Sequence, residues 1–137
     1  MHSNNIERAH HSVHHVHDLI LRIFTCPAPA GQAAISELMP VFADTFSMVT
    51  TGGAIVDRDQ VAHLFHRAMG ARPGLQILVS DLHTVWQAGD TVAVRYQETH
   101  WLAEVSSARL SLVILQDTPA GVRWHYLHET ALSPEAQ

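Results

Sequence analysis

The stretch Trp124-His125-Tyr126-Leu127-His128-Glu129-Thr130 alternates large apolar rings with imidazoles and a carboxylate near the end of the chain. Successive residues of a β-strand point to opposite faces of its sheet. Strict alternation therefore puts His125, Leu127 and Glu129 on one face and the rings of Trp124 and Tyr126 on the other. We expect the first set to face the interior, because large rings suit an aromatic surface between subunits.

Three further strands precede this one and make up a meander over residues 75–132. The expected strands cover residues 75–87, 91–102, 108–117 and 122–132, with hairpin turns at Ala88-Gly89-Asp90 and Pro119-Ala120-Gly121. A shorter strand is expected at residues 46–50, followed by the turn Gly52-Gly53. Helical patterns come before the meander and do not alternate with its strands, which favours an α+β fold.

Three helices are expected before the meander, at residues 5–24, 32–43 and 57–69. Pro40 should kink or shorten the second helix, because proline cannot donate the backbone hydrogen bond of a helix interior. Asp57 has the position of an N-cap for the third helix, and Gln60 is its capping-box partner.

Length and composition indicate one domain over residues 1–137 with an ordinary globular core: 47% of the residues are hydrophobic. The formal net charge of −5 offers no basic stripe for nucleic acid. Residues 19–21 form the longest early apolar run, which is too short to span a membrane. The single Cys26 fits a reducing compartment, so the expected location is the cytoplasm. No phosphate-binding or other cofactor motif is present, and no cofactor is expected.

Residues 110–115 read Leu-Ser-Leu-Val-Ile-Leu and are apolar on both faces of their strand. In an antiparallel sheet this pattern indicates that both faces are covered. The helices can cover one face only. We therefore expect a second copy of the chain on the other face, in a two-fold homodimer.

Several local phrases resemble the nuclear transport factor 2-like (SnoaL-like) superfamily, and within it a bacterial branch of unknown function. They are Phe46-Ser47-Met48-Val49-Thr50 with Gly52-Gly53, Ala71-Arg72-Pro73-Gly74-Leu75, Gly89-Asp90-Thr91-Val92-Ala93-Val94-Arg95-Tyr96, and the closing stretch quoted first. The resemblance implies an α+β cone of cystatin-like fold, with three helices packed on a curved antiparallel sheet, a pocket at one end, and dimers through the outer sheet face. Its members include isomerases, dehydratases, cyclases, epoxide hydrolases and structural adaptors, so it does not name a reaction.

Titratable residues that share strand faces predict a pocket with acid–base chemistry. Tyr96, Glu98 and His100 lie on one face of the strand from residue 91. We expect Glu98 or Glu129 as the base, His125 as its imidazole partner and Tyr96 as a hydrogen-bond donor. Two carboxylates in one cavity repel, which should raise one pKa. The ligand pocket is expected to include Tyr96, His100, Met48, Leu127 and His17. The alternative is a buried Glu–His hydrogen bond that only fixes the strand register.

The histidine run His10-His11-Ser12-Val13-His14-His15-Val16-His17 is a weaker candidate for a metal site. His11, His15 and Asp18 lie on adjacent turns of one helix face and could bind Zn²⁺ or Ni²⁺. That face should be solvated and offers no fourth protein ligand, so adventitious binding or none is favoured over a physiological site.

Three functions remain open at this point. The first is a binder of a small, largely apolar molecule, with or without isomerase-, dehydratase- or cyclase-like turnover. The second is a non-catalytic dimerisation or adaptor module. The third is a metal-binding protein that uses the histidine cluster of the first helix.

Overall fold

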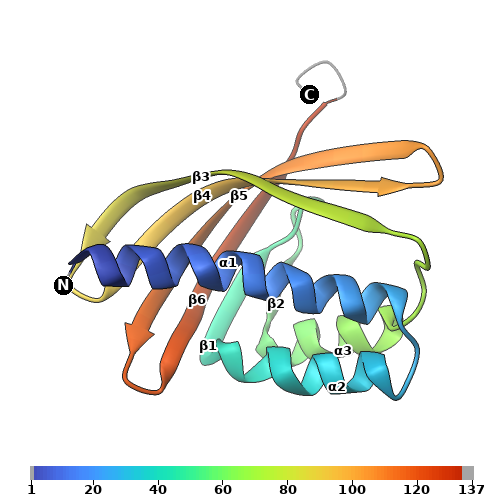
Figure 1. Cartoon of the computed structure of the whole chain (residues 1–137), viewed down its shortest axis with the longest axis horizontal. Helices are drawn as coiled ribbons and strands as arrows, with labels where there is room; N and C mark the ends of the chain where they lie inside the picture. The colour runs from blue at the N-terminus through green and yellow to red at the C-terminus, as the bar shows by residue number, and fades with distance from the viewer. Residues whose placement is uncertain (1, 134–137) are drawn as a thin grey trace.

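The structure is a computed structural model that describes residues 2–133. The first half of the chain is mostly helical and the second half is a meander of long strands (Figure 1). The helices are α1 (His2–Thr25), α2 (Ala30–Leu38), the short 3₁₀ helix η1 (Met39–Val41) and α3 (Arg58–Ala68). The strands are β1 (Phe42–Val49), β2 (Ile55–Asp57), β3 (Gln76–Ala88), β4 (Thr91–Leu102), β5 (Val105–Thr118) and β6 (Gly121–Ala131).

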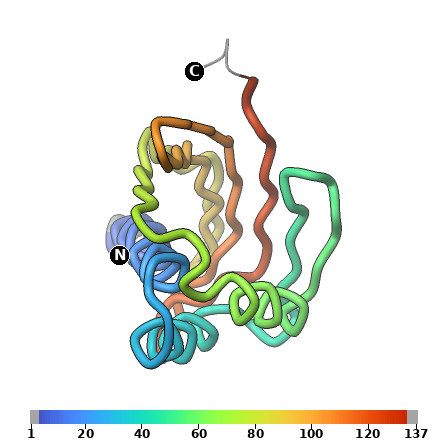
Figure 2. Tube along the Cα trace, turned by 90° about the vertical axis from the view of Figure 1, so that its right-hand side faces the viewer, coloured from blue at the N-terminus to red at the C-terminus, as the bar shows by residue number. Residues whose placement is uncertain are grey.

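All six strands form one sheet in the order β2-β1-β6-β5-β4-β3. The meander β3 to β6 is antiparallel throughout, as expected, whereas β1 joins β6 in parallel. The sheet curves around α1, which runs along its concave face (Figure 1), and the view along the layers shows α2 and α3 closing one side (Figure 2). This arrangement is the predicted α+β cone of three helices on a curved sheet.

The second helix is shorter than predicted, and the strand after it begins earlier. Helix α2 ends at Leu38, Pro40 lies in the 3₁₀ turn, and β1 begins at Phe42 instead of residue 46. The missing N–H of the proline accounts for the early end. The capping box of α3 is confirmed: Asp57 Oδ1 accepts from the Gln60 backbone N–H at 2.9 Å, and Gln60 Oε1 accepts from the Asp57 N–H at 2.8 Å.

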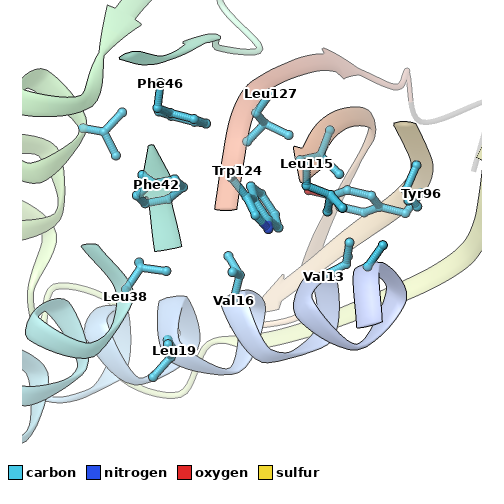
Figure 3. Packing of buried hydrophobic residues seen from close by; sticks show 14 of the residues in the cluster. Val13, Val16, Leu19, Leu38, Phe42, Phe46, Tyr96, Leu115, Trp124 and Leu127 are labelled. Carbon is cyan, nitrogen blue, oxygen red and sulfur yellow. The ribbon is translucent and has the colours of Figure 1, made fainter. Parts of the chain in front are cut away.

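The core lies between α1 and the concave face of the sheet. Val13, Val16 and Leu19 are fully buried along one stripe of α1, and Figure 3 shows the Trp124 ring directed from β6 toward this stripe. The indole N–H of Trp124 donates to Ser12 Oγ at 3.0 Å, which satisfies both polar atoms inside the core. These contacts hold α1 across the sheet and so fix the side chains that α1 contributes to the site.

Candidate functional site

A cavity of about 330 Å³ lies between α1, α3, β1 and the concave faces of β4, β5 and β6. Most of its wall is aliphatic or aromatic, including Phe24, Phe42, Leu64, Phe65, Trp124 and Leu127. Five ionisable side chains also line it: His17, Glu98, His100, Arg109 and Glu129. An apolar cavity with a few convergent polar groups is the usual form of a small-molecule site.

Glu98 is the centre of the polar group. Its carboxylate lies between two imidazoles: His17 Nε2 is 3.0 Å from Oε1, and His100 Nε2 is 2.5 Å from Oε2. The three side chains are almost fully buried, with 4–5% of each exposed. A buried carboxylate in an apolar wall requires such partners, because an unpaired charge there is strongly disfavoured.

The hydrogen bonds of His17 define its charge. Its Nδ1 lies 2.7 Å from the carbonyl oxygen of Val13, and its Nε2 faces Glu98, so both ring nitrogens meet acceptors. Both nitrogens must donate, and His17 is therefore an imidazolium. Burial lowers the pKa of His17, but the hydrogen bond and negative charge of Glu98 outweigh burial and raise that pKa above 6.5.

His100 differs from His17 in having one ring nitrogen without a partner. Its Nε2 donates to Glu98, while its Nδ1 meets no acceptor in the described part of the chain that could hold a second N–H. Within residues 2–133, this buried Nδ1 has no hydrogen-bond partner. A carboxylate that fixes the tautomer of a histidine is how a general base is oriented. Nδ1 could act as that base only when a ligand in the cavity reaches it, because this atom is closed off from solvent in the free protein.

The two carboxyl groups of the cavity have opposite pKa shifts. Burial acts to raise the pKa of Glu98, but the hydrogen bonds from His100 and His17 outweigh it, and the pKa lies well below its usual 4.5. Burial raises the pKa of Glu129, against the opposing positive charge of Arg109. Glu98 therefore stays ionised as an orienting partner, while Glu129 can exchange a proton.

The structure brings most of the predicted site residues together. Glu98, Glu129, His100, Met48, Leu127 and His17 all line the cavity. Tyr96 lies beneath the cavity wall in the core, with its ring edge-on to His17 at 5.2 Å between centroids.

His125 is not at the cavity, and the predicted faces of His125 and Trp124 are wrong. The register between β5 and β6 shifts at this point: Ile114 pairs with Tyr126, and Leu115 pairs with Trp124. His125 is the extra residue of a β-bulge, which reverses the alternation on its N-terminal side. Trp124 is therefore buried, and His125 lies 3.0 Å from Gln116 Oε1 through its Nε2.

The sequence reasoning missed Arg109 and the imidazole partners of Glu98. Arg109 pairs with Glu98 across β4 and β5, on the same face of β5 as the buried Ser111 and Val113. The signal in the sequence was an arginine two residues before an inward-facing position, in the alternation expected of a strand. The partners His17 and His100 were both expected in the pocket. His100 lies two residues from Glu98 on the same face of β4, whereas the His17 contact joins α1 to β4 across 81 residues, and no sequence pattern encodes that contact.

The histidine cluster of α1 does not form a metal site among the described residues. Within residues 2–133, no group of three or more His, Cys, Asp or Glu side chains is arranged to hold a metal ion. The His11 and His15 rings stack at 6.3 Å between centroids, and His15 Nε2 lies 3.4 Å from Glu37 Oε2. The structure thus pairs His15 with a surface glutamate and does not gather His11, His15 and Asp18. No helix of the described chain is long and apolar enough to cross a membrane.

The His17–Glu98 pair predicts a defined pH dependence of stability. The pKa of His17 is raised on folding, so its contribution is complete below pH 6.5 and is lost as the pH rises through the folded pKa. Glu98 has a lowered pKa, so its contribution is complete above pH 4.5 and is lost on acidification. Urea unfolding from pH 5.5 to 9 should show a falling free energy of unfolding, and the part due to this pair should vanish in His17→Gln. An equal decline in both proteins would contradict the assignment.

Comparison with known proteins gives solved structures of the same fold. A nuclear transport factor 2-like protein of unknown function from Pseudomonas aeruginosa is 31% identical, with a TM-score of 0.83 over 92% of this chain and 99% of that chain. A candidate dehydratase of the same family from Streptomyces avermitilis is 16% identical, with a TM-score of 0.73 over 97% and 99% of the two chains. A protein with a cystatin-like fold from Novosphingobium aromaticivorans is 18% identical, with a TM-score of 0.60 over 75% and 72%.

Scans against models of protein families and against curated proteins found no match. The match with the Pseudomonas protein extends over nearly the whole of both chains and combines sequence identity with the same fold. The chain therefore belongs to the nuclear transport factor 2-like superfamily.

Proposed function

We propose that the protein binds a compact, largely apolar small molecule in the cavity and transfers a proton to and from it. The observation that carries this proposal is the buried His100–Glu98 pair in a mostly apolar wall. A site that served only to fix strand register would not need a cavity of about 330 Å³ beside it. The description of the Streptomyces protein as a candidate dehydratase agrees with proton-transfer chemistry on this fold.

The proposed step is removal of a proton from a carbon next to a carbonyl group. His100 Nδ1 is closed off from solvent in the free protein, so the ligand first opens the wall around it, and the electron pair of this nitrogen then takes the proton. The electrons of the C–H bond move onto the carbonyl oxygen to form an enolate. Glu98 stabilises the resulting imidazolium through the hydrogen bond that it already accepts from Nε2. Return of the proton from His100 to a different carbon would complete an isomerase-like reaction. Loss of a β-hydroxyl group as water, with the proton held by His100, would complete a dehydratase-like one. Attack of the enolate on a second carbonyl carbon, whose oxygen takes the proton from His100, would complete a cyclase-like one.

An isotope-exchange assay tests this step without knowledge of the natural substrate. The probe is 1-tetralone, a compact apolar ketone, incubated with the protein in D₂O and followed by proton NMR. General-base catalysis contributes about 10²–10⁴-fold, so the wild type should exchange the protons next to the carbonyl faster than buffer by up to that factor. His100→Gln should lose this acceleration, while the solvent-exposed His83→Gln should retain it.

A matched pair of tryptophan variants tests whether exchange takes place in the cavity. Leu64 is 40% exposed and lines the cavity from α3, so Leu64→Trp can fill that space without forcing a large ring into the core. Leu78 is 49% exposed on β3 and does not line the cavity, so Leu78→Trp is the control. Exchange should stop in the first variant only. Wild-type exchange no faster than buffer would favour the non-catalytic module.

We also propose that a second copy of the chain covers the convex face of the sheet. Leu110 is 39% exposed there, beside Leu112, Tyr126 and the exposed Val85. Sedimentation equilibrium should give a dimer for the wild type and a monomer for Leu110→Glu. Leu64→Glu, at a residue of the same exposure on α3, should remain a dimer. Monomeric wild-type protein would exclude this interface. The proposed location is the cytoplasm, consistent with the lone Cys26.

A further inference from the structure

Arg109 is the one cation of the cavity that is only loosely paired. It lines the cavity from β5, and its Nη1 lies 3.5 Å from Glu129 Oε2, its only ion pair among the described residues. A quarter of its side chain remains exposed. A guanidinium carries five N–H donors in a planar fork, so one long contact leaves most of them available to a ligand.

The charges around Arg109 balance only while the cavity holds no anion. Glu98 is paired with the His17 imidazolium, and Arg109 is paired with Glu129, so the four groups sum to zero. An anion bound at Arg109 would add a negative charge beside Glu129 in an apolar wall. Two negative charges side by side in a mostly apolar cavity repel each other, and this repulsion raises the pKa of one of the two groups. Uptake of one proton by Glu129 would restore neutrality.

We propose that the cavity binds a compact apolar carboxylate through Arg109, and that Glu129 takes up a proton as the carboxylate enters. The inference rests on the proposed binding function and names its ligand class. The guanidinium fork matches a carboxylate in bidentate geometry. The protonated Glu129 would donate a hydrogen bond to the same ligand, and side chains such as Phe24, Phe65 and Leu127 would contact its apolar body.

The surroundings of Glu129 favour such proton uptake. Burial already raises the pKa of this carboxyl above its usual value. The titratable groups around it are Arg109 from β5, Tyr96, Glu98 and His100 from β4, and His17 from α1. Helix α3 and strand β1 contribute no ionisable side chain to the cavity. The two imidazoles already contact Glu98. Arg109 is therefore the group that can exchange its contact with Glu129 for one with a ligand.

Two matched probes test the inference by isothermal titration calorimetry on the full chain. The probes are 2-naphthoate and 2-naphthylmethanol, which share an apolar body and differ in charge. At pH 6 naphthoate should bind at least about tenfold more tightly, as expected for a charge-assisted hydrogen bond. Above the pKa of free Glu129, the dissociation constant of naphthoate should rise about tenfold per pH unit, and heats in two buffers should report uptake of about one proton. Naphthylmethanol should show neither effect.

Two variants assign these effects to residues. Glu129→Gln keeps the shape of the side chain but cannot take up the proton, so naphthoate binding should become independent of pH and release or bind no protons. Arg109→Gln should remove the preference for naphthoate over naphthylmethanol. If Arg109→Gln does not fold, the comparison of the two ligands on the wild-type protein and on Glu129→Gln still tests the carboxylate inference.

The outcomes separate this inference from the function on which it rests. Equal affinity for the two probes, or naphthoate binding without proton uptake, would overturn the carboxylate inference and leave cavity binding intact. Binding of neither probe would overturn cavity binding of compact apolar molecules and the carboxylate inference with it. Tighter naphthoate binding that disappears in Leu64→Trp and depends on Arg109 would support both.

Discussion

Glu98→Leu should lower the free energy of unfolding by about 3–5 kcal/mol at pH 6.5, the cost of removing one partner from a buried ion pair. Leucine has a similar volume, so the loss comes from electrostatics. The His17 imidazolium would lose its counterion, and Nε2 of both His17 and His100 would lose their acceptor. Urea denaturation followed by circular dichroism measures the change.

Glu37→Leu is the matched control, because Glu37 also pairs with a histidine. The His15–Glu37 contact is 3.4 Å, but both side chains are about half exposed, and such pairs contribute about 0–1 kcal/mol. A double variant, His17→Leu with Glu98→Leu, should recover part of the loss, since it removes the stranded charge. Equal costs for Glu98→Leu and Glu37→Leu would mean that the buried pair is not ionised.

Trp124→Ala should cost about 3–5 kcal/mol, the range for truncation of a large buried aromatic residue. Trp124 is 1% exposed, its ring lies against Phe42 and His17, and it donates the hydrogen bond that satisfies the buried Ser12 hydroxyl. The same denaturation experiment measures the cost. The variant also tests the β-bulge in β6, because strict alternation would place this ring on the opposite face.

Trp86→Ala supplies the comparison for a tryptophan outside the core. Trp86 is 55% exposed on β3, and substitutions at such positions change stability by about 0.5 kcal/mol or less. A loss in Trp124→Ala no larger than the loss in Trp86→Ala would contradict the inward position of Trp124. A loss several times larger would confirm the register shift between β5 and β6.

Local patterns predicted most elements of this fold, though not the short strand β2, because they depend on neighbours in the chain. The capping box at Asp57, the hairpin turns and the alternation of β4 each require only a few adjacent residues, and the structure confirms them. The sheet faces of Trp124 and His125 could not be predicted, because a bulge depends on pairing with β5 and leaves no local signal in the sequence. The parallel pairing of β1 with β6 was missed for the same reason.

The candidate site also contains features that local patterns predicted and features that they did not. Strand periodicity placed Glu98 and His100 on one face, and the structure finds both at the cavity. It could not choose which imidazole meets which carboxylate: His125 was expected as the partner, but His17 and His100 occupy that role. The His17 contact joins distant segments, so it follows from the packing of α1 on the sheet, whereas His100 meets Glu98 from two residues further along the same strand.

The sheet order has a consequence for how the chain acquires its fold. Strand β6 is the last in chain order, yet it lies inside the sheet between β1 and β5. Until residues 121–131 are available, β1 and β5 lack the strand that joins them in one sheet, because each pairs with β6 and not with the other. Non-local pairing of this kind is slow and leaves strand edges open to other chains. The cavity, the β1–β6 ladder and the burial of Trp124 are therefore all completed by the same late event.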